Sequence, residues 1–230
     1  MLIKDWLTSG VITVLVDETV FKVSNLMKEK GVRCLPVLNS KGLLEGIVTD
    51  LDLCRASPSK ATTLDVFELN YLLSNVKIDT IMTKKVITVK LDHTIEFAAA
   101  LMLENKISHL PVLDDDGAIV GIVSQADIFK ALVKISGVYE DGCQFAFALD
   151  DRPGSIKEVS DVIRSHGGRL MSIFTHVDDE NGGSREVYIR IKRMAADNFA
   201  KLTQELNSKF KILYCVEDTL EELKSRSGKN

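Results

Sequence analysis

The 230-residue chain has few of the residues that staple or anchor a protein, with four cysteines, four prolines and one tryptophan. Cys34, Cys54, Cys143 and Cys215 stand far apart without a CxxC pair, which argues against a zinc site or a disulfide framework. No apolar run approaches the roughly 20 residues of a membrane span, and no signal peptide opens the chain. We therefore expect a soluble, cytoplasmic protein with reduced thiols, no membrane contact and no bound metal.

Charge and catalytic motifs are equally sparse. The net charge is -4 without a basic block, so a broad nucleic-acid-binding face is not expected, and no helix-turn-helix is appended. A Ser-His-Asp order, a glycine-rich phosphate loop and an HExxH helix are all missing. The sequence favours a protein that is not an enzyme, and turnover of AMP or ATP would support the alternative of a nucleotide-processing enzyme.

What the chain does contain is an internal repeat. Residues 2–53 align with residues 77–128 without a gap, and 20 of the 52 pairs are identical, against roughly one in fifteen by chance. The longest matches are Val-Ile-Thr-Val, Leu-Pro-Val-Leu and Gly-Ile-Val-Thr/Ser. Two copies of one small unit usually pack about a pseudo-two-fold axis, so we expect two related pockets in the groove between them.

Each copy has the pattern of a β-α-β-β-α unit. In the first copy, strands are expected at 11–15, 34–38 and 43–48. The helix between them begins near the capping types Asp17 and Thr19 and is closed by a glycine, and a second helix begins near Asp52. The second copy repeats this order, starting with a strand at 86–89.

The pattern changes after residue 134. Strands and helices then alternate in the order βαββαβ, which is the ferredoxin-like arrangement. We expect a mixed α/β (α+β) chain with three domains, at 1–60, 77–134 and 138–220. A linker at 61–76 joins the first two domains and contains a helix over 64–73. Residues 221–230 are expected to form a tail.

A hydroxyl and a carboxylate recur at the same place in both copies, as Thr49-x-x-Asp52 and Ser124-x-x-Asp127. The hydroxyl ends a strand and the acid falls in the first helical turn, so both can face one opening. The carboxylate can accept the hydroxyls of a ribose, while the hydroxyl and the helix N–H groups can hold a phosphate. The alternative is that each pair is simply a capping box.

The Leu-Pro-Val strands supply an apolar wall nearby. Pro36 and Pro111 are expected to break edge pairing and to leave backbone groups beside the wall, which suits an adenine ring. The alternative is a plain strand entry. Candidate contacts next to the prolines are Leu35, Leu110, Arg33 and His109, although His109 can also be a satisfied polar core residue.

These residues carry a resemblance that covers residues 1–134. The duplicated unit with Pro-Val, Gly-Ile-Val-Thr/Ser and Asp resembles a tandem pair of cystathionine-β-synthase-type (CBS) domains, a Bateman module. The resemblance implies an adenosine ligand, namely AMP, ADP, ATP or S-adenosylmethionine, with Thr49 and Asp52 at one pocket and Ser124 and Asp127 at the other. It also implies that the first strand of each copy lines the base, through Ile12, Thr13, Ile87 and Thr88.

Residues 143–216 resemble an ACT domain, a small amino-acid-sensing module. Asp151-Arg152-Pro153-Gly154 matches the Asp-x-Pro-Gly turn of that family, which implies an amino acid bound at a dimer interface. The departure is Gly167-Gly168-Arg169-Leu170, where the supporting asparagine of many members is not obvious. A dimerising module without ligand is the alternative.

The whole arrangement resembles the acetoin-utilisation protein B family of bacteria. It implies a homodimeric regulator of an unknown partner protein, linked to acetoin or central carbon metabolism. A ligand-free assembly module that acts by protein contact is the rival interpretation.

Overall fold

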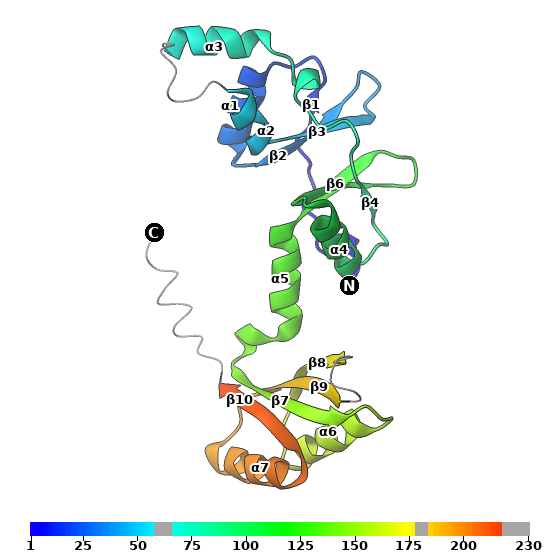
Figure 1. Ribbon diagram of the computed structural model, residues 1–230, viewed down its shortest axis with the longest axis vertical. Helices are drawn as coiled ribbons and strands as arrows, with labels where there is room; N and C mark the ends of the chain where they lie inside the picture. The colour runs from blue at the N-terminus through cyan, green and yellow to red at the C-terminus, as the bar shows by residue number, and fades with distance from the viewer. Residues whose placement is uncertain (58–65, 178–183, 218–230) are drawn as a thin grey trace. The chain divides into compact units, whose positions relative to one another are not determined.

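The computed structural model describes residues 1–57, 66–177 and 184–217, which form two compact units, Met1–Phe129 and the part from Lys130 onward (Figure 1). The predicted tail at 221–230 lies outside the described residues.

The first copy has the predicted order of elements. They are β1 (Val14–Leu15), α1 (Val20–Lys30), β2 (Cys34–Leu38), β3 (Leu44–Thr49) and α2 (Asp50–Ala56). The sheet order is β1-β2-β3, with β1 parallel to β2 and β2 antiparallel to β3.

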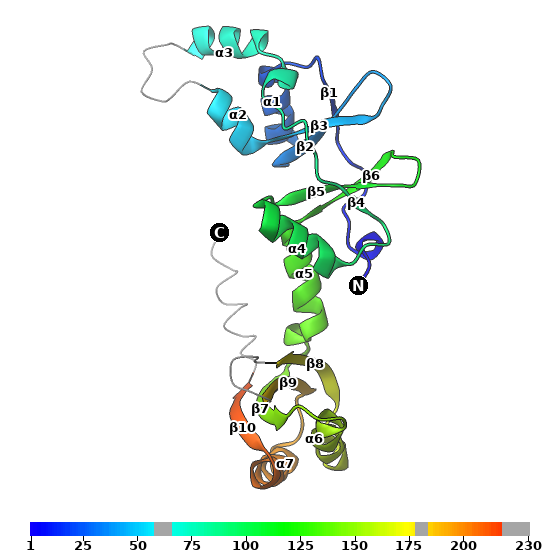
Figure 2. The ribbon, with the colours of Figure 1, turned by 45° about the vertical axis from the view of Figure 1, so that its right-hand side comes forward.

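The second copy repeats this plan. Its elements are β4 (Val89–Lys90), α4 (Ile95–Asn105), β5 (His109–Leu113), β6 (Ile119–Ser124) and α5 (Gln125–Ser136) (Figure 2). The sheet order is β4-β5-β6, and the strand registers are those of the first copy shifted by 75 residues. The irregularity between Val37 and Leu38 also recurs, between Val112 and Leu113.

The first strand of each copy is shorter than the predicted ranges 11–15 and 86–89. Parallel pairing joins β1 to β2 only at Val14 and Leu15, and β4 to β5 only at Val89 and Lys90. A strand needs a partner for its ladder, so the residues before these pairs form irregular chain. Thr13 and Thr88 therefore stand just before a strand rather than inside one.

Threonines, not the aspartates two residues earlier, cap the first helix of each copy. Thr19 Oγ1 accepts a hydrogen bond from Lys22 N at 3.3 Å, and Thr94 Oγ1 accepts one from Phe97 N at 3.1 Å. The side-chain oxygen satisfies a helix N–H that has no partner within the helix. Each helix therefore begins one residue after its threonine.

Each copy is completed by the segment that leads into the other copy. We call residues 76–83, which lead into copy two, the second leader. Its backbone is paired with copy one: Val20 N donates to Val76 O at 2.9 Å, and Thr83 N donates to Ile47 O at 2.9 Å. The short 3-10 turn Ile78–Thr80 lies between these bonds.

The first leader, residues 1–8, does the same for copy two. Ile95 N donates to Met1 O at 2.9 Å, and Thr8 N donates to Ile122 O at 3.0 Å. Its 3-10 turn is Ile3–Asp5. These bonds are related to those of the second leader by the same 75-residue offset, so the two copies exchange their leaders about a pseudo-two-fold relation.

Apolar packing fastens the exchanged leaders. Ile3 and Ile78 are both 0% exposed. Gly46 and Gly121 allow close approach, because a Cβ at Gly46 would lie 2.4 Å from Met82 Sδ and one at Gly121 would lie 2.1 Å from Leu7 Cδ1. Burial of the leader side chains removes apolar surface from water and so holds the copies together.

The link between the copies contains α3 (Val66–Asn75), two residues later than the predicted helix at 64–73. Leu64 lies outside the described residues.

The second unit confirms the ferredoxin-like order. Its elements are a 3-10 turn (Val138–Glu140), β7 (Gly142–Asp150), α6 (Ser155–Ser165), β8 (Leu170–Val177), β9 (Ser184–Lys192), α7 (Ala196–Lys209) and β10 (Lys211–Glu217). The antiparallel sheet has the order β10-β7-β9-β8, and α6 and α7 lie on one side of it (Figure 1).

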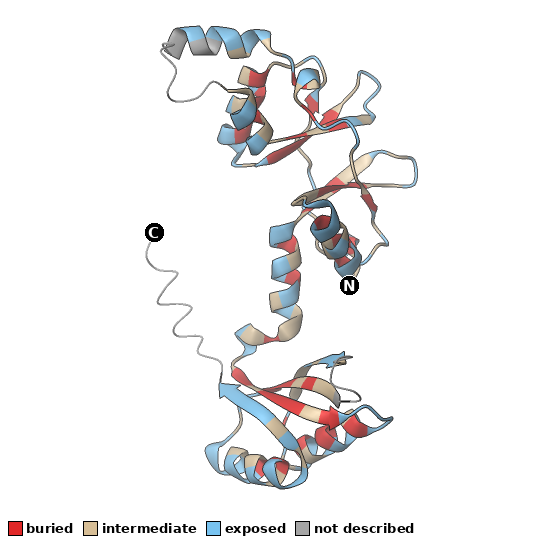
Figure 3. Cartoon of the chain, viewed as in Figure 1, coloured by how far each residue is buried: buried red, intermediate tan, exposed pale blue. Residues whose placement is uncertain are grey.

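Alternating residues of the two central strands form the core of this unit. Phe145, Phe147, Ile189 and Ile191 are fully buried and pack with Leu202 of α7. Figure 3 shows the buried residues gathered along β7 and on the sheet-facing side of the helices. Because side chains alternate between the two faces of a strand, the apolar residues at every second position of β7 and β9 lie on the helix side of the sheet.

Candidate functional site

The Thr49-x-x-Asp52 motif forms a capping box at the junction of β3 and α2. Thr49 Oγ1 accepts from Asp52 N at 3.3 Å, and Asp52 Oδ2 accepts from Thr49 N at 2.9 Å. The Thr49 hydroxyl also donates to the same Oδ2 at 2.7 Å. Both bonds that the carboxylate accepts use Oδ2, so Oδ1 of this half-buried carboxylate takes no part in them.

Ser124 and Asp127 repeat the arrangement between β6 and α5. Asp127 Oδ2 accepts from Ser124 N at 3.0 Å and from the Ser124 hydroxyl at 2.6 Å, and Asp127 N donates to Ser124 Oγ at 3.3 Å. Asp127 is only 6% exposed. The capping alternative is therefore realised in both copies, and the ribose and phosphate roles of these residues stay a prediction.

His109 is influenced by charged groups of both copies. It begins β5, and its Nδ1 lies 2.9 Å from Ser108 Oγ. Burial lowers the pKa of His109, while Asp50 of copy one and Asp127 of copy two raise it and Arg33 of copy one lowers it further. The desolvation effect is the largest, so the imidazole is neutral near pH 7.

Cys34 is the residue of copy one that corresponds to His109. It begins β2 and is buried. Burial raises the pKa of its thiol to about 12, and the negative charges of Asp52 and Asp50 act in the same direction. Asp50 therefore influences the first residue of the central strand in both copies.

Sequence reasoning missed Asp50. It occupies the first position of α2, directly after Thr49, and its N–H donates to Arg33 O at 3.0 Å. The available signal was the repeat itself, because an offset of 75 pairs Cys34 with His109 and Asp50 with Gln125.

The prediction that the prolines break an edge ladder was wrong. β2 and β5 are the central strands of their sheets. Pro36 is paired with Ile47 on β3, and parallel pairing with β1 begins one residue later. Pro111 is placed in the same way in copy two. Because proline lacks an N–H, it fits where the central strand has no neighbour on that side.

The residues predicted to form the apolar wall lie in the interior, and their contact with a base stays a prediction. Leu35, Pro36, Leu110 and Pro111 are all buried, with Leu35 and Leu110 almost wholly removed from solvent.

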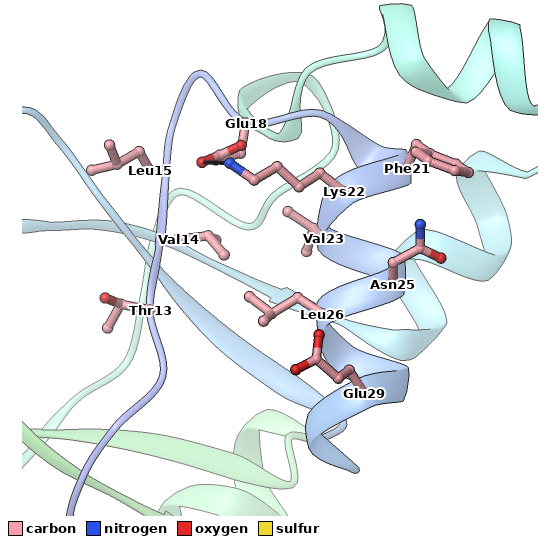
Figure 4. Close-up of a pocket in the computed structure, with 10 residues that line it drawn as sticks. All are labelled: Thr13, Val14, Leu15, Glu18, Phe21, Lys22, Val23, Asn25, Leu26 and Glu29. Carbon is pink, nitrogen blue, oxygen red and sulfur yellow. Dashed lines mark hydrogen bonds and ion pairs between the residues drawn. The ribbon is translucent and has the colours of Figure 1, made fainter.

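Two cavities lie in the first copy. The larger, of about 710 Å³, lies between β1 and α1 and includes Thr13 (Figure 4). Val14 and Leu26 point toward each other across it, whereas the Thr13 side chain points away from α1. The second, of about 440 Å³, is lined by Arg33 and Asp50 among others. Neither of these cavities is lined by Asp52 or Asp127.

The turn Asp151-Arg152-Pro153-Gly154 lines a cavity of about 430 Å³ at the start of α6. Gly154 caps the helix with φ 91°, a left-handed conformation that suits glycine. Arg185 of β9 pairs with Asp151 at 2.7 Å. Arg152 makes two 2.8 Å bonds to Glu158, so both charged side chains of the turn already have partners.

A family model for the CBS domain matches residues 3–59 and again residues 78–134. An uncharacterised protein of Methanocaldococcus jannaschii, MJ1426, is 36% identical over 155 residues, which cover 58% of this chain and 92% of that protein. The chain belongs to the CBS-domain proteins. Residues 3–134 are a tandem CBS pair.

Other relatives carry the CBS pair within longer chains. Homoserine O-acetyltransferase of Methanococcus vannielii is 32% identical over 131 residues, which cover 57% of this chain but 25% of that enzyme. This chain thus spans about a quarter of that relative. The similarity concerns the CBS pair rather than the whole enzyme.

Solved structures of CBS pairs are also similar. A protein of Bacillus anthracis with a TM-score of 0.51 and 18% identity, covering 58% of this chain and 94% of that one, has the same fold. CBSX2, described in complex with AMP, is 31% identical over 59% of this chain and 98% of that one, with a TM-score of 0.48. The CBS pair of MJ0100, described in complex with 5′-methylthioadenosine and S-adenosyl-L-methionine, is 30% identical over 57% and 95%, with a TM-score of 0.48.

Within the described residues, none of the helices combines the length and apolar character needed to cross a bilayer. In the same part of the chain, no three His, Cys, Asp or Glu side chains gather in a way that would hold a metal ion.

Proposed function

We propose that this chain is a regulatory protein that binds an adenosine-containing ligand, AMP, ADP, ATP or S-adenosylmethionine, between its two CBS copies. The observation that carries the proposal is that Arg33 and Asp50 of copy one, together with Asp127 of copy two, influence the pKa of His109 in copy two. A cation, two carboxylates and an imidazole beside an apolar wall are the groups that phosphate, ribose and adenine require.

Each part of the ligand has a candidate partner. Oδ1 of Asp52 lies outside the capping bonds and can accept ribose hydroxyls, and the corresponding Asp127 is proposed for the same role in copy two. The guanidinium of Arg33 is exposed and can pair with a phosphate or a carboxylate. We propose that the base lies beside Leu35, Pro36, Leu110 and Pro111. Ile12, Thr13, Ile87 and Thr88 are proposed to border it from the segments just before β1 and β4.

The similar CBS pairs support the choice of ligand class. One is described with AMP and another with 5′-methylthioadenosine and S-adenosyl-L-methionine. We propose that the ligand acts by favouring one packing of the two copies over another, which requires different affinity for the two packings. The exchanged leaders give such a change a direct route from one copy to the other.

For the second unit we propose an ACT domain that dimerises the chain and holds an amino acid at the Asp151–Gly154 turn. The cavity at the start of α6 supports this, because a helix N-terminus favours a carboxylate. The ion pairs of Asp151 and Arg152 favour the alternative of a domain that dimerises without ligand. The link to acetoin or central carbon metabolism and the identity of the regulated protein stay predictions.

Calorimetric titration of AMP, ADP, ATP and S-adenosylmethionine tests the central proposal. We expect Asp52→Ala and Asp127→Ala each to weaken one binding event by about tenfold or more, as loss of a charged hydrogen bond does. Asp17→Ala is the matched control, since Asp17 is exposed and caps no helix. Unchanged affinity in both variants would show that the ribose assignment is wrong.

A flat thermal-shift response to all four nucleotides and to amino acids would favour the ligand-free assembly module instead. Turnover of AMP or ATP by the purified chain would favour an enzyme.

A further inference from the structure

Two cysteines that are distant in the sequence lie side by side in the second unit. Cys143 stands on β7 and Cys215 on the neighbouring β10. Cys215 is opposite Phe145 and Cys143 is opposite Glu217, so the cysteines form a diagonal pair on one face of the sheet. Their side chains are joined by a hydrogen bond.

The two thiols differ in their access to solvent. Cys143 is 4% exposed and belongs to the core of the unit, whereas Cys215 is exposed. β10 is an edge strand with β7 as its one neighbour in the sheet. A solvent-borne oxidant can therefore reach Cys215, and the buried Cys143 is placed to attack the product.

The hydrogen bond also favours the reactive form of Cys215. It lowers the pKa of the Cys215 thiol, against the opposing effects of burial and of Glu217. Thiolate is the nucleophilic form of cysteine. By contrast, burial raises the pKa of Cys34 to about 12, which keeps that thiol inert.

We propose that Cys143 and Cys215 form a reversible disulfide that ties the edge strand β10 to β7, with Cys215 as the attacking thiol and Cys143 as the resolving thiol. The proposal does not depend on nucleotide binding. In a reducing compartment such a bond is transient and reports oxidative conditions.

Hydrogen peroxide is the oxidant we assign to this step. The Cys215 thiolate attacks one peroxide oxygen, so an S–O bond forms, the O–O bond breaks and hydroxide leaves. The Cys143 thiolate then attacks the Cys215 sulfur, so the S–S bond forms and a second hydroxide leaves. The two hydroxides take the two thiol protons. Two thiols and one peroxide thus give one disulfide and two waters.

The fold leaves room for this bond to close. Diagonal cross-strand neighbours stand about 7–8 Å apart at Cα, about 1 Å beyond the usual disulfide range, so β10 must draw closer to β7. Its ladder is interrupted between Ile212 and Tyr214, and an edge strand has no second neighbour to disturb. A cavity of about 190 Å³ lined by Cys143 and Phe199 gives the buried sulfur space to rotate.

The test is oxidation of the reduced, full-length protein with a small excess of peroxide. We expect titratable thiols in denaturant to fall from four to two, with peptide mapping by mass spectrometry showing a Cys143–Cys215 link within one chain. Dithiothreitol should restore all four thiols. Four remaining thiols, a link between two chains or a link to Cys54 would each overturn the proposal.

Three variants assign the roles. Cys143→Ser should leave Cys215 as a sulfenic acid that dimedone labels, and Cys215→Ser should lose both the link and the label. Cys54→Ser removes the other exposed thiol and is the matched control, which should oxidise like the parent. If Cys143→Ser fails to fold, the Cys215→Ser variant at the exposed position is sufficient. A disulfide that still forms in Cys215→Ser must join other cysteines and would contradict the proposal.

Discussion

The two CBS copies share one backbone plan and differ in chemistry where their central strands begin. Copy one places Arg33, Cys34 and Asp50 there, and copy two has Ser, His and Gln at the corresponding positions. The strand registers, capping boxes and exchanged leaders are nevertheless the same. The scaffold is therefore symmetric while its charges are not, and we expect the two proposed pockets to bind ligands with unequal affinity.

The buried leader isoleucines test the symmetric part of this comparison most severely. Ile3→Ala and Ile78→Ala should each lower the free energy of unfolding by about 2–5 kcal/mol, because each leaves a cavity in the copy that its leader covers. Urea denaturation measures the loss. Lys4→Ala, on the same leader but exposed, should change stability by less than about 0.5 kcal/mol. A large loss in only one of the two isoleucine variants would contradict equal roles for the leaders.

The two glycines beneath the leaders should respond unequally. Gly121→Ala drives a methyl group into the branched Leu7 side chain and should cost about 1–3 kcal/mol of stability. Gly46→Ala meets the flexible Met82 and should cost less. Thermal denaturation ranks the two variants. Adding Leu7→Ala to Gly121→Ala should recover part of the loss, and no recovery would mean that the clash lies elsewhere.

The ends of α1 and α4 give a smaller contrast. Gly31 ends α1 with φ 64°, and Lys106 ends α4 with φ 55°. A side chain is disfavoured in this left-handed conformation. Gly31→Ala should lower the free energy of unfolding by about 1 kcal/mol, whereas Lys106→Gly should raise it by about 0.5 kcal/mol, since glycine's greater unfolded-state entropy offsets part of the gain. Chemical denaturation of both variants checks the opposite signs, and equal signs would refute the comparison.

His109 should give the smallest effect at neutral pH and a visible one only on acidification. Burial holds its folded-state pKa below the unfolded value of about 6.5. The unfolded chain then binds more protons, so stability is full above that pH and declines as the pH falls below it. His109→Cys, which copies the neutral Cys34, should flatten this decline. The free energies of unfolding of the parent protein and of His109→Cys, measured at pH 7.5 and 5.5, test this prediction. An equal decline in the two proteins would show that His109 is not responsible.

Local patterns predicted most of the fold. The apolar spacing and the closing glycine located α1, and the change of pattern after residue 134 predicted the βαββαβ order that begins with β7. The capping box was predictable because Thr49 and Asp52 are only three residues apart. The short β1 and β4 were not, since the length of a parallel ladder depends on where the partner strand ends rather than on the residues of the strand itself.

Contacts between distant segments were beyond the sequence pattern. Nothing in the spacing of Ile3 or Ile78 shows that each is buried in the opposite copy. The influence of Asp50 on His109 also depends on how the copies pack. The central position of Pro36 depends on the pairing of β1 with β2 within copy one, which residue spacing does not show. The pairing of Cys143 with Cys215 depends on the register of two strands at opposite ends of the unit.

The exchange of leaders determines which truncated forms of this protein can fold. An excised fragment that starts at the repeat boundary would carry its own leader but lack the one that finishes its sheet. Such a fragment would expose an unpaired strand edge and a groove shaped for isoleucine, which invites two fragments to complete each other. The smallest unit that we expect to fold independently is therefore the pair of copies. A single copy is expected to form domain-swapped oligomers.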